Sequence, residues 1–218
     1  DVAALSSAAA ASLTSTQLNA LTSTNLDALT TAQVSKLTTT QVSNLTSTQL
    51  NLMETTDLAA LTTTQVVSLT AAQLDGLDAT HLAALSSVAS LTSTQLNAMA
   101  STNLQGLNTT QVASLTTTQV SNLTTTQLNL LETSDVAALS TGAVASLTST
   151  QLNALTSTNL QALTTGQNAA LTTTQASNLT STQLNLMQTS DVAALSSTAA
   201  ASLTSTQLNA LSSTNLDA

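Results

Sequence analysis

The sequence predicts a mainly α protein, a solenoid or superhelix of very short capped helices with one helix in each eight-residue repeat. Three observations predict this fold. The chain is a tandem array of octads that each begin with Leu or Met. A helix-capping pattern recurs at the same place in most octads, and the apolar residues cannot share one face of a single long helix.

The octad repeat covers the whole sequence. Cutting before each leading Leu or Met gives LTSTQLNA, LTSTNLDA, LTTAQVSK and so on, and the 218 residues divide into 26 octads, one six-residue unit at 85–90 and four leading residues. Asp1, Asp57, Asp135 and Asp191 each open a DVAALS-like segment, which marks a larger unit of seven octads. We therefore predict a single continuous array over 1–218 with a 56-residue super-repeat. Neither end has the polar capping repeat of a free solenoid, so we expect a longer array.

Each octad carries a helix-start signal. Numbered from the leading Leu, position two is Ser or Thr in 20 of 26 octads and position five is Gln in 15, which together form a recurrent capping box. Asp78 and Asn108 are further good caps at position two. The apolar residues at positions one and six, such as Leu13 and Leu18, stand where a hydrophobic staple places its two partners.

A single continuous helix is the first alternative, and its geometry argues against it. Eight residues at about 100° each rotate the apolar pair by about 80° per octad, so no apolar stripe persists along such a helix. A helix that stops after about six residues and restarts at the next cap directs every apolar pair to one interior, with three or four octads expected per superhelical turn. Asn44, Asn122 and Asn178 occupy position eight, where Asn tolerates the left-handed conformation that ends helices.

A β-solenoid is the second alternative, because Thr and Val favour strands and stacked Gln side chains form amide ladders. Positions one and six differ by an odd number, so a flat strand sends them to opposite faces. A turn would be needed inside every octad, and only four Gly and no Pro are available for such turns. Short helices remain the favoured interpretation.

Composition excludes several classes of function. The chain has one Lys, no Arg and a formal net charge of −9, so it lacks the cationic surface that binds nucleic acid or anionic membranes. No stretch approaches the roughly 20 continuous apolar residues of a membrane span, and the first residues lack the pattern of a signal peptide. We expect neither nucleic-acid binding nor membrane insertion.

No catalytic constellation is visible in the sequence. His81 is the only histidine and stands where Gln usually stands, so we interpret it as a substituted capping residue. Lys36 occupies position eight, near an expected helix end where a cation suits the helix dipole. Serines and threonines are abundant, but a nucleophile needs a base within hydrogen-bond reach. We predict no enzyme activity, no catalytic residue and no cofactor.

Paired acids are the remaining candidates for chemistry. Glu54 with Asp57 and Glu132 with Asp135 lie three residues apart, whereas the third copy has Gln in place of the Glu that precedes Asp191. A calcium loop needs more oxygen ligands and usually a Gly-assisted turn. We predict no metal site and interpret the acids as residues that favour helix N-termini.

One irregularity suggests an assembly surface. Position eight is usually small or polar, but Leu52, Leu130 and Leu186 fill it once per long repeat. These leucines either pack against Ala-rich octads, at 8–11 and 199–201, or form an apolar seam between neighbouring chains. The second interpretation is the functional one, and we define these three residues as the possible assembly seam.

The tandem L-[ST]-x-x-[QND]-[LV]-x-x pattern, as in LTTTQVSN and LTSTQLNL, resembles the Leu/Thr/Gln-rich arrays of long, secreted bacterial surface proteins, including adhesin-like and filament-forming ones. The resemblance implies an extracellular or cell-surface scaffold. From it we expect a structural repeat protein that contributes to a fibre, stalk or surface scaffold by end-to-end and lateral self-association. The alternative is a surface-binding module that presents a regular Thr array to ice or carbohydrate.

Overall fold

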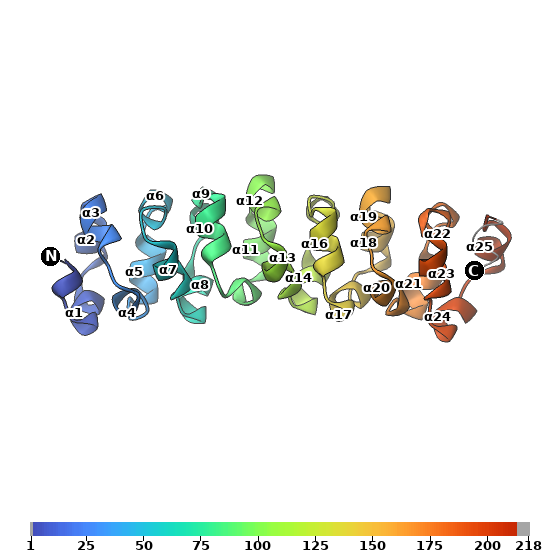
Figure 1. Ribbon diagram of the computed structural model, residues 1–218, viewed down its shortest axis with the longest axis horizontal. Coiled ribbons are helices and arrows are strands. Elements are labelled where there is room, and N and C mark those ends of the chain that lie inside the picture. The colour runs from blue at the N-terminus through green and yellow to red at the C-terminus, as the bar shows by residue number, and fades with distance from the viewer. Residues whose placement is uncertain (1, 213–218) are drawn as a thin grey trace. The chain divides into compact units, whose positions relative to one another are not determined.

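The computed structural model describes residues 2–212 of the chain, and in this range it contains 25 α-helices, two short 3-10 helices and no strand (Figure 1). The mainly α prediction is therefore confirmed, and the β-solenoid alternative is wrong. The chain forms two compact units, Asp1–Gln111 and Val112–Ala218, each of which is described by itself.

The first unit contains η1 (Val2–Ala4), α1 (Ser7–Ser12), α2 (Ser15–Asn19), α3 (Ser23–Asp27), α4 (Thr31–Val34), α5 (Thr39–Asn44), α6 (Ser47–Leu50), α7 (Thr55–Ala59), α8 (Thr63–Ser68), α9 (Ala71–Gly76), α10 (Ala79–Ala84), η2 (Val88–Ser90), α11 (Ser93–Ala98) and α12 (Ser101–Gln105). Helix α13 (Thr109–Ala113) includes the boundary between the units. The second unit contains α14 (Thr117–Asn122), α15 (Thr125–Leu128), α16 (Thr133–Ala138), α17 (Thr141–Ala145), α18 (Ser149–Asn153), α19 (Ser157–Gln161), α20 (Thr165–Ala169), α21 (Thr173–Asn178), α22 (Ser181–Leu186), α23 (Thr189–Ala193), α24 (Ser197–Ala201) and α25 (Ser205–Asn209).

Most helices begin as the capping pattern predicts. In α8, the N-cap Thr62 has extended backbone angles, its side chain accepts a hydrogen bond from the Gln65 N–H, and the Gln65 side chain accepts one from the Thr62 N–H. The same reciprocal box starts most LTxTQ octads, including α2, α5, α14 and α21. Helices of four to six residues are too short to be stable alone, so these caps and the packing between helices hold them.

The helices end differently from the prediction. No described non-glycine residue has positive φ, so Asn44, Asn122 and Asn178 do not adopt the left-handed conformation. Each is the last residue of its helix and donates a side-chain hydrogen bond to the carbonyl oxygen four residues earlier. The next Leu then turns to extended angles, as Leu45 does with φ −64° and ψ 142°. The chain passes directly from helical to extended backbone, which is why the connections need neither Gly nor Pro.

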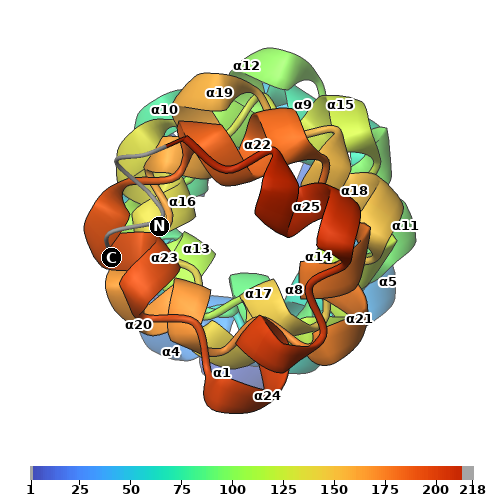
Figure 2. The same cartoon turned by 90° about the vertical axis from the view of Figure 1, so that its right-hand side faces the viewer.

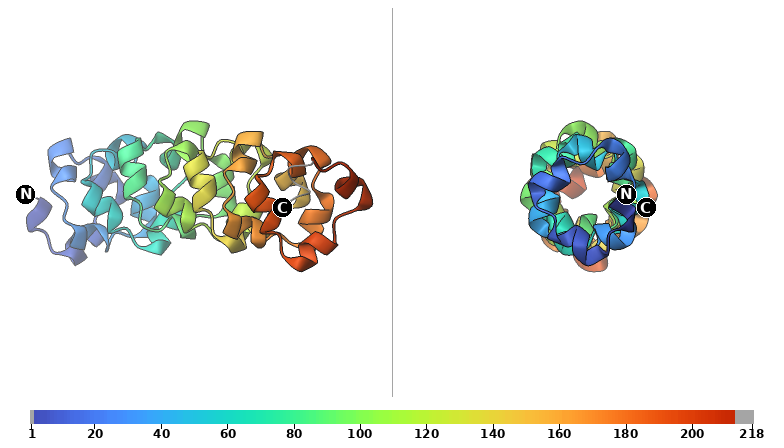
Figure 3. Two further views of the ribbon diagram at one scale, coloured as in Figure 1. Left: turned by 45° about the vertical axis from the view of Figure 1, so that its right-hand side comes forward. Right: turned by 90° about the vertical axis from the view of Figure 1, so that its left-hand side faces the viewer.

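Within each unit, most helices pack against the third helical element further along the chain. In the first unit α5 packs against α8 and α6 against α9, and in the second α14 packs against α17 and α21 against α24. The helices of the second unit follow one another around a ring in Figure 2, and those at the start of the first unit do so in the right panel of Figure 3. Both units therefore have the stacked, solenoid-like arrangement that the octad repeat predicted.

The core of each unit is made by the apolar residues at positions one and six. The leading residues from Leu29 to Leu195 are all buried, with 1–9% of their surface exposed. Position six is occupied by similarly buried Leu or Val in most octads, such as Leu74 and Val144, both with 0% exposure. Burial of one such side chain is worth about 1.5–3 kcal/mol. The apolar pairs thus supply the stability that no single helix has.

The six-residue unit at 85–90 is absorbed by a shorter helix. It forms the 3-10 helix η2, whose Val88 is buried and which packs against α8. Because two residues are missing, side chains downstream in the first unit bond to carbonyls that are 26 and 29 residues earlier, instead of the usual 28 and 31. The deletion shifts the register and leaves the stacking intact.

Four α-helices, α7, α12, α16 and α23, begin without a side-chain cap hydrogen bond, and only α12 has at its N-cap a residue that cannot form one. Ala100 is the N-cap of α12 and makes no side-chain cap hydrogen bond, whereas Thr156 caps the corresponding helix α19 with an oxygen 3.2 Å from the Asn159 nitrogen. We expect Ala100→Thr to raise the free energy of unfolding by about 1 kcal/mol and Thr156→Ala to lower it by the same amount. Urea titrations followed by circular dichroism measure both changes. Equal stability of Ala100→Thr and the parent chain would contradict the prediction.

Candidate functional site

The contacts between successive turns are the most elaborate feature of the described residues. Gln73 shows their geometry. Its Oε1 accepts a hydrogen bond from the Thr70 N–H at 2.7 Å, and its Nε2 donates to the carbonyl oxygens of Val42 at 2.8 Å and Leu45 at 2.6 Å. One amide thus caps its own helix and closes the end of a helix in the preceding turn. We call this arrangement the glutamine bridge.

The bridge satisfies every hydrogen-bonding group of a buried amide. A glutamine side chain has two N–H donors and one oxygen with two acceptor positions. In Gln65 the two donors reach Val34 and Leu37, and the oxygen accepts from both the N–H and the hydroxyl of Thr62. The carbonyls at a helix end otherwise have no intrahelical partner. Gln65 is 2% exposed, so the bridge replaces water at both helix ends.

The bridge recurs in both units with a constant register. The bonded carbonyls lie 28 and 31 residues before the amide, so one turn takes 28 residues, or three and a half octads. This agrees with the three or four octads expected per turn, and it makes the 56-residue super-repeat two complete turns. The glutamines that donate to both carbonyls in this register include Gln33, Gln41, Gln65, Gln73, Gln151, Gln167, Gln175 and Gln207.

Asparagine at position seven makes a second link, which points to the following turn. Asn51 donates from Nδ2 to the Gly76 carbonyl oxygen, 25 residues later, at 2.7 Å. Asn129, Asn153 and Asn185 make the same bond with Ala154, Asn178 and Ala210. Each turn is therefore bonded backward through position five and forward through position seven.

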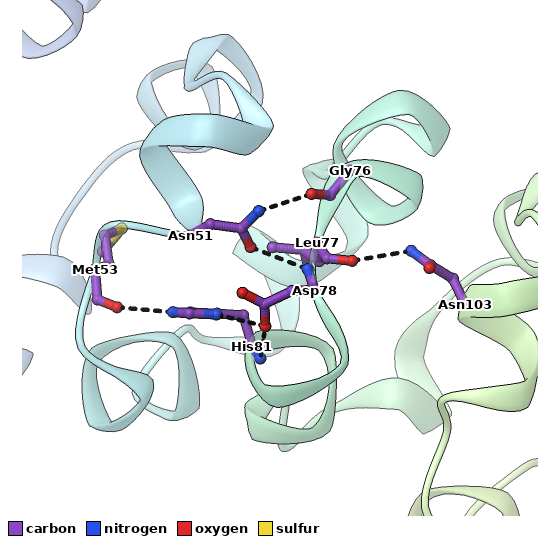
Figure 4. A network of polar contacts seen from close by, with 7 residues as sticks. All are labelled: Asn51, Met53, Gly76, Leu77, Asp78, His81 and Asn103. Carbon is purple, nitrogen blue, oxygen red and sulfur yellow. Dashed lines mark hydrogen bonds and ion pairs between the residues drawn. The ribbon is translucent and has the colours of Figure 1, made fainter.

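Where position five is not Gln, the asparagine at position seven of the preceding turn can accept the hydrogen bond from the N-cap N–H instead. Figure 4 shows this around Asp78, whose N–H donates to Asn51 Oδ1 at 3.1 Å because His81 offers it no acceptor. Asn129 Oδ1 likewise accepts from the Thr156 N–H, since the shorter Asn159 is occupied with carbonyls of the preceding turn. The N-cap N–H is satisfied in both cases.

His81 stands at position five, where the sequence predicted a substituted capping residue, and it also reaches the preceding turn as a bridging glutamine does. Its Nδ1 lies 2.7 Å from Asp78 Oδ1 and its Nε2 lies 3.2 Å from the Met53 carbonyl oxygen, 28 residues earlier (Figure 4). Hydrogen bonds from the backbone and ring of His81 lower the pKa of the Asp78 carboxyl below its usual value. The ring spans the same two turns that a glutamine bridge spans.

The predicted acids lie in the first turns of their helices, but their surroundings differ from the expectation. Asp57, Asp135 and Asp191 are buried, with 3–4% exposure, in α7, α16 and α23. Burial, together with the charges of Glu54 and Asp27, raises the pKa of Asp57 to about 6. Burial is also the main cause that raises the pKa values of Asp135 and Asp191.

The remaining candidates have simple positions. Lys36 is exposed just after the end of α4. Among residues 2–212 there is no group of three or more His, Cys, Asp or Glu side chains that could hold a metal ion. In the same range no helix has the length and apolar character that crossing a membrane requires.

The three seam leucines lie at the ends of equivalent octads. Leu52 is 40% exposed and borders a depression of about 240 Å³ with Ser23, Thr24 and Asp27. Leu130 and Leu186 are half-buried. Their 56-residue separation equals two turns of the second unit, which puts both on one side of that unit.

Sequence comparison identifies the repeat. A family model for the ALTTAQ repeat matches residues 50–87, 88–125 and 128–165, which together make up just over half of the chain. A search of curated proteins found no match. The three matches are tandem, as the octad pattern requires, and the chain therefore belongs to the ALTTAQ repeat family.

Proposed function

We propose that this protein is a structural repeat protein that contributes to an extracellular fibre, stalk or surface scaffold by self-association. The observation that carries the proposal is the glutamine bridge. It devotes the most frequent buried polar side chain of the repeat to holding one turn on the next. The proposal takes the protein to be no enzyme, because the described acids and the single histidine serve helix starts and turn contacts.

The polarity of the bridge supports end-to-end association. Position-five amides always donate toward the preceding turn, and the carbonyls that they reach face the following turn. A surface that offers donors on one side and acceptors on the other is complementary to a second copy in the same orientation. Such head-to-tail contacts produce open filaments when no rotation closes them.

Lateral association is assigned to the seam formed by Leu52, Leu130 and Leu186. Leu52 is exposed, and Leu130 and Leu186 are half-buried on one side of the second unit, so each unit offers apolar surface that a neighbouring filament can cover. Two further properties belong to the same proposal. The resemblance supports secretion to a bacterial cell surface, and the net charge of −9 supports the absence of a nucleic-acid partner.

Electron microscopy and sedimentation of the purified chain test this function. We expect filaments whose axial period matches one or two turns, and we expect the variant carrying Leu52→Ser, Leu130→Ser and Leu186→Ser to give single filaments instead of bundles. The control triple variant Thr40→Ser, Thr118→Ser and Thr174→Ser alters exposed positions outside the seam, removes only one methyl group at each, and should bundle as before. A monodisperse monomer at every protein concentration would refute the proposal.

A second candidate is a surface-binding module for ice or carbohydrate. It is favoured by the exposed threonine pairs at positions three and four, such as Thr117 with Thr118 and Thr173 with Thr174, which recur after two turns of the second unit. Thermal-hysteresis and glycan-binding measurements distinguish this candidate from the scaffold. Activity in either one with no filament formation would favour the module.

A further inference from the structure

Aspartate replaces the bridging amide at position five once in each long repeat. Asp57, Asp135 and Asp191 occupy this position, and each is at least 96% buried. The octads around them keep the usual register, since Gln65 bonds to Val34 and Leu37, and Gln207 bonds to Ala176 and Leu179. The carboxyls therefore lie in sites where other octads place an amide donor.

Asparagine at the same position shows that a side chain of this length reaches the preceding turn. Asn103 donates to the carbonyl oxygens of Leu74 and Leu77 at 2.6 and 3.2 Å. Asn159 donates to those of Leu128 and Leu131, both at 3.3 Å. Asp and Asn have the same size, but an ionised carboxylate only accepts hydrogen bonds. An ionised Asp in this site therefore cannot replace the amide as a donor to the preceding turn.

The charged groups around the aspartates do not supply a cation. Asp57 faces the acids Glu54 and Asp27. Helices α4 and α10 pack against its helix, α7. Helix α4 has no titratable side chain, and α10 contributes His81, which is paired with Asp78. Asp135 faces Glu132, and α19 has no titratable side chain. Asp191 is bonded by the Asn168 amide of α20, which has no titratable side chain.

We propose that Asp57, Asp135 and Asp191 are proton-binding sites that stabilise the folded array in mild acid, and that at Asp57 and Asp191 the proton converts the buried carboxyl from an acceptor into a donor to the preceding turn of the same unit. The proton comes from solvent and stays on a carboxyl oxygen, which at these two sites donates it to a carbonyl of the preceding turn. The other oxygen keeps the capping role, as Asp135 does toward the Glu132 N–H and Asp191 toward the Gln188 N–H.

The direction of the pH effect follows from linkage. The pKa of Asp57 is about 6 in the folded protein and 3.8 in the unfolded chain, so the folded state binds the proton more tightly. Its contribution to stability is fully present below the unfolded value and is lost as the pH rises through about 6. The raised pKa values of Asp135 and Asp191 act in the same direction.

Thermal unfolding at about pH 5 and about pH 7.5 tests the proposal. We expect the melting temperature of the parent chain to be about 5 °C higher at the lower pH. In a variant with Asn in place of all three aspartates, the side chains keep their size and donate at every pH. The difference between its melting temperatures at the two pH values should therefore be less than about a third of that of the parent chain. At the higher pH this variant should be more stable than the parent chain.

Asp75→Asn is the matched control, because it removes one charge at position seven and keeps the acceptor that bonds the Ala100 N–H. It should retain the full pH response, whereas Asp57→Asn alone should reduce it. Carbon-13 titration of the side-chain carboxyls in the parent chain gives an independent readout, with a midpoint near 6 expected for Asp57. Ordinary midpoints for all three aspartates, or an unchanged pH response in the triple variant, would overturn the proposal.

Discussion

Replacing Gln65 with alanine is expected to lower the free energy of unfolding by about 3 kcal/mol, because three hydrogen bonds to backbone groups are lost at about 1 kcal/mol each. These groups are the Thr62 N–H and the carbonyls of Val34 and Leu37, which lie within 2.8 Å of the Gln65 amide. Urea unfolding followed by circular dichroism measures the loss. A solenoid turn contacts only its neighbours, so the substitution should also broaden the transition by uncoupling the turns on either side.

Gln17→Ala is the matched control for this prediction. Gln17 forms the same capping box with Thr14, but it is exposed, and among the described residues its side chain bonds only to Thr14 of its own octad. The Gln17→Ala variant should lose only the contribution of the cap to the free energy of unfolding, about 1 kcal/mol. Equal losses for the two variants would show that the bond between turns adds nothing, and the glutamine bridge would then be a capping device alone.

The octad pattern predicted the local structure because capping is a local interaction. The Ser or Thr at position two and the Gln at position five lie in one turn of helix, so their pairing can be read from four consecutive residues. The buried positions followed from the same pattern, since Leu13-like and Leu18-like residues recur at every helix start. The helix ends were predicted wrongly because Asn44 satisfies a carbonyl with its side chain, and no change of backbone hand is needed.

The bonds between turns were not predicted, because they join residues 25 to 31 positions apart and their register depends on the packing of whole helices. One signal in the sequence was available. Capping boxes accept Glu as well as Gln, and acids favour helix N-termini, yet Glu never occupies position five in the 26 octads. The absence of Glu at a position that is Gln in 15 octads indicates a preference for a side chain that donates as well as accepts. The possible assembly seam remains a prediction, because nothing in one chain shows what covers it.

Replacing Asn168 with valine is expected to raise the free energy of unfolding by about 1–2 kcal/mol, since a buried polar atom without a partner is removed. Asn168 stands at position six, where most octads have Leu or Val, and it is 1% exposed. Its Nδ2 donates to the Leu163 and Thr164 carbonyls of its own octad, but its Oδ1 has no hydrogen-bond partner. Valine fits this position, because Val112 occupies it one long repeat earlier.

The comparison should be made in the Asp191→Asn background, because Asn168 also bonds the Asp191 carboxyl and its loss would otherwise strand a buried charge. The control is Asn159→Val, which makes the same exchange one octad earlier at position five. Asn159 bonds the Leu128 and Leu131 carbonyls of the preceding turn, so this variant should lose about 2 kcal/mol. A gain of stability at position six and a loss at position five would show that position six needs an apolar side chain for packing, whereas position five needs an amide to bond the preceding turn. Losses at both sites would mean that the Asn168 amide contributes more through its two donated bonds than its unpaired oxygen costs.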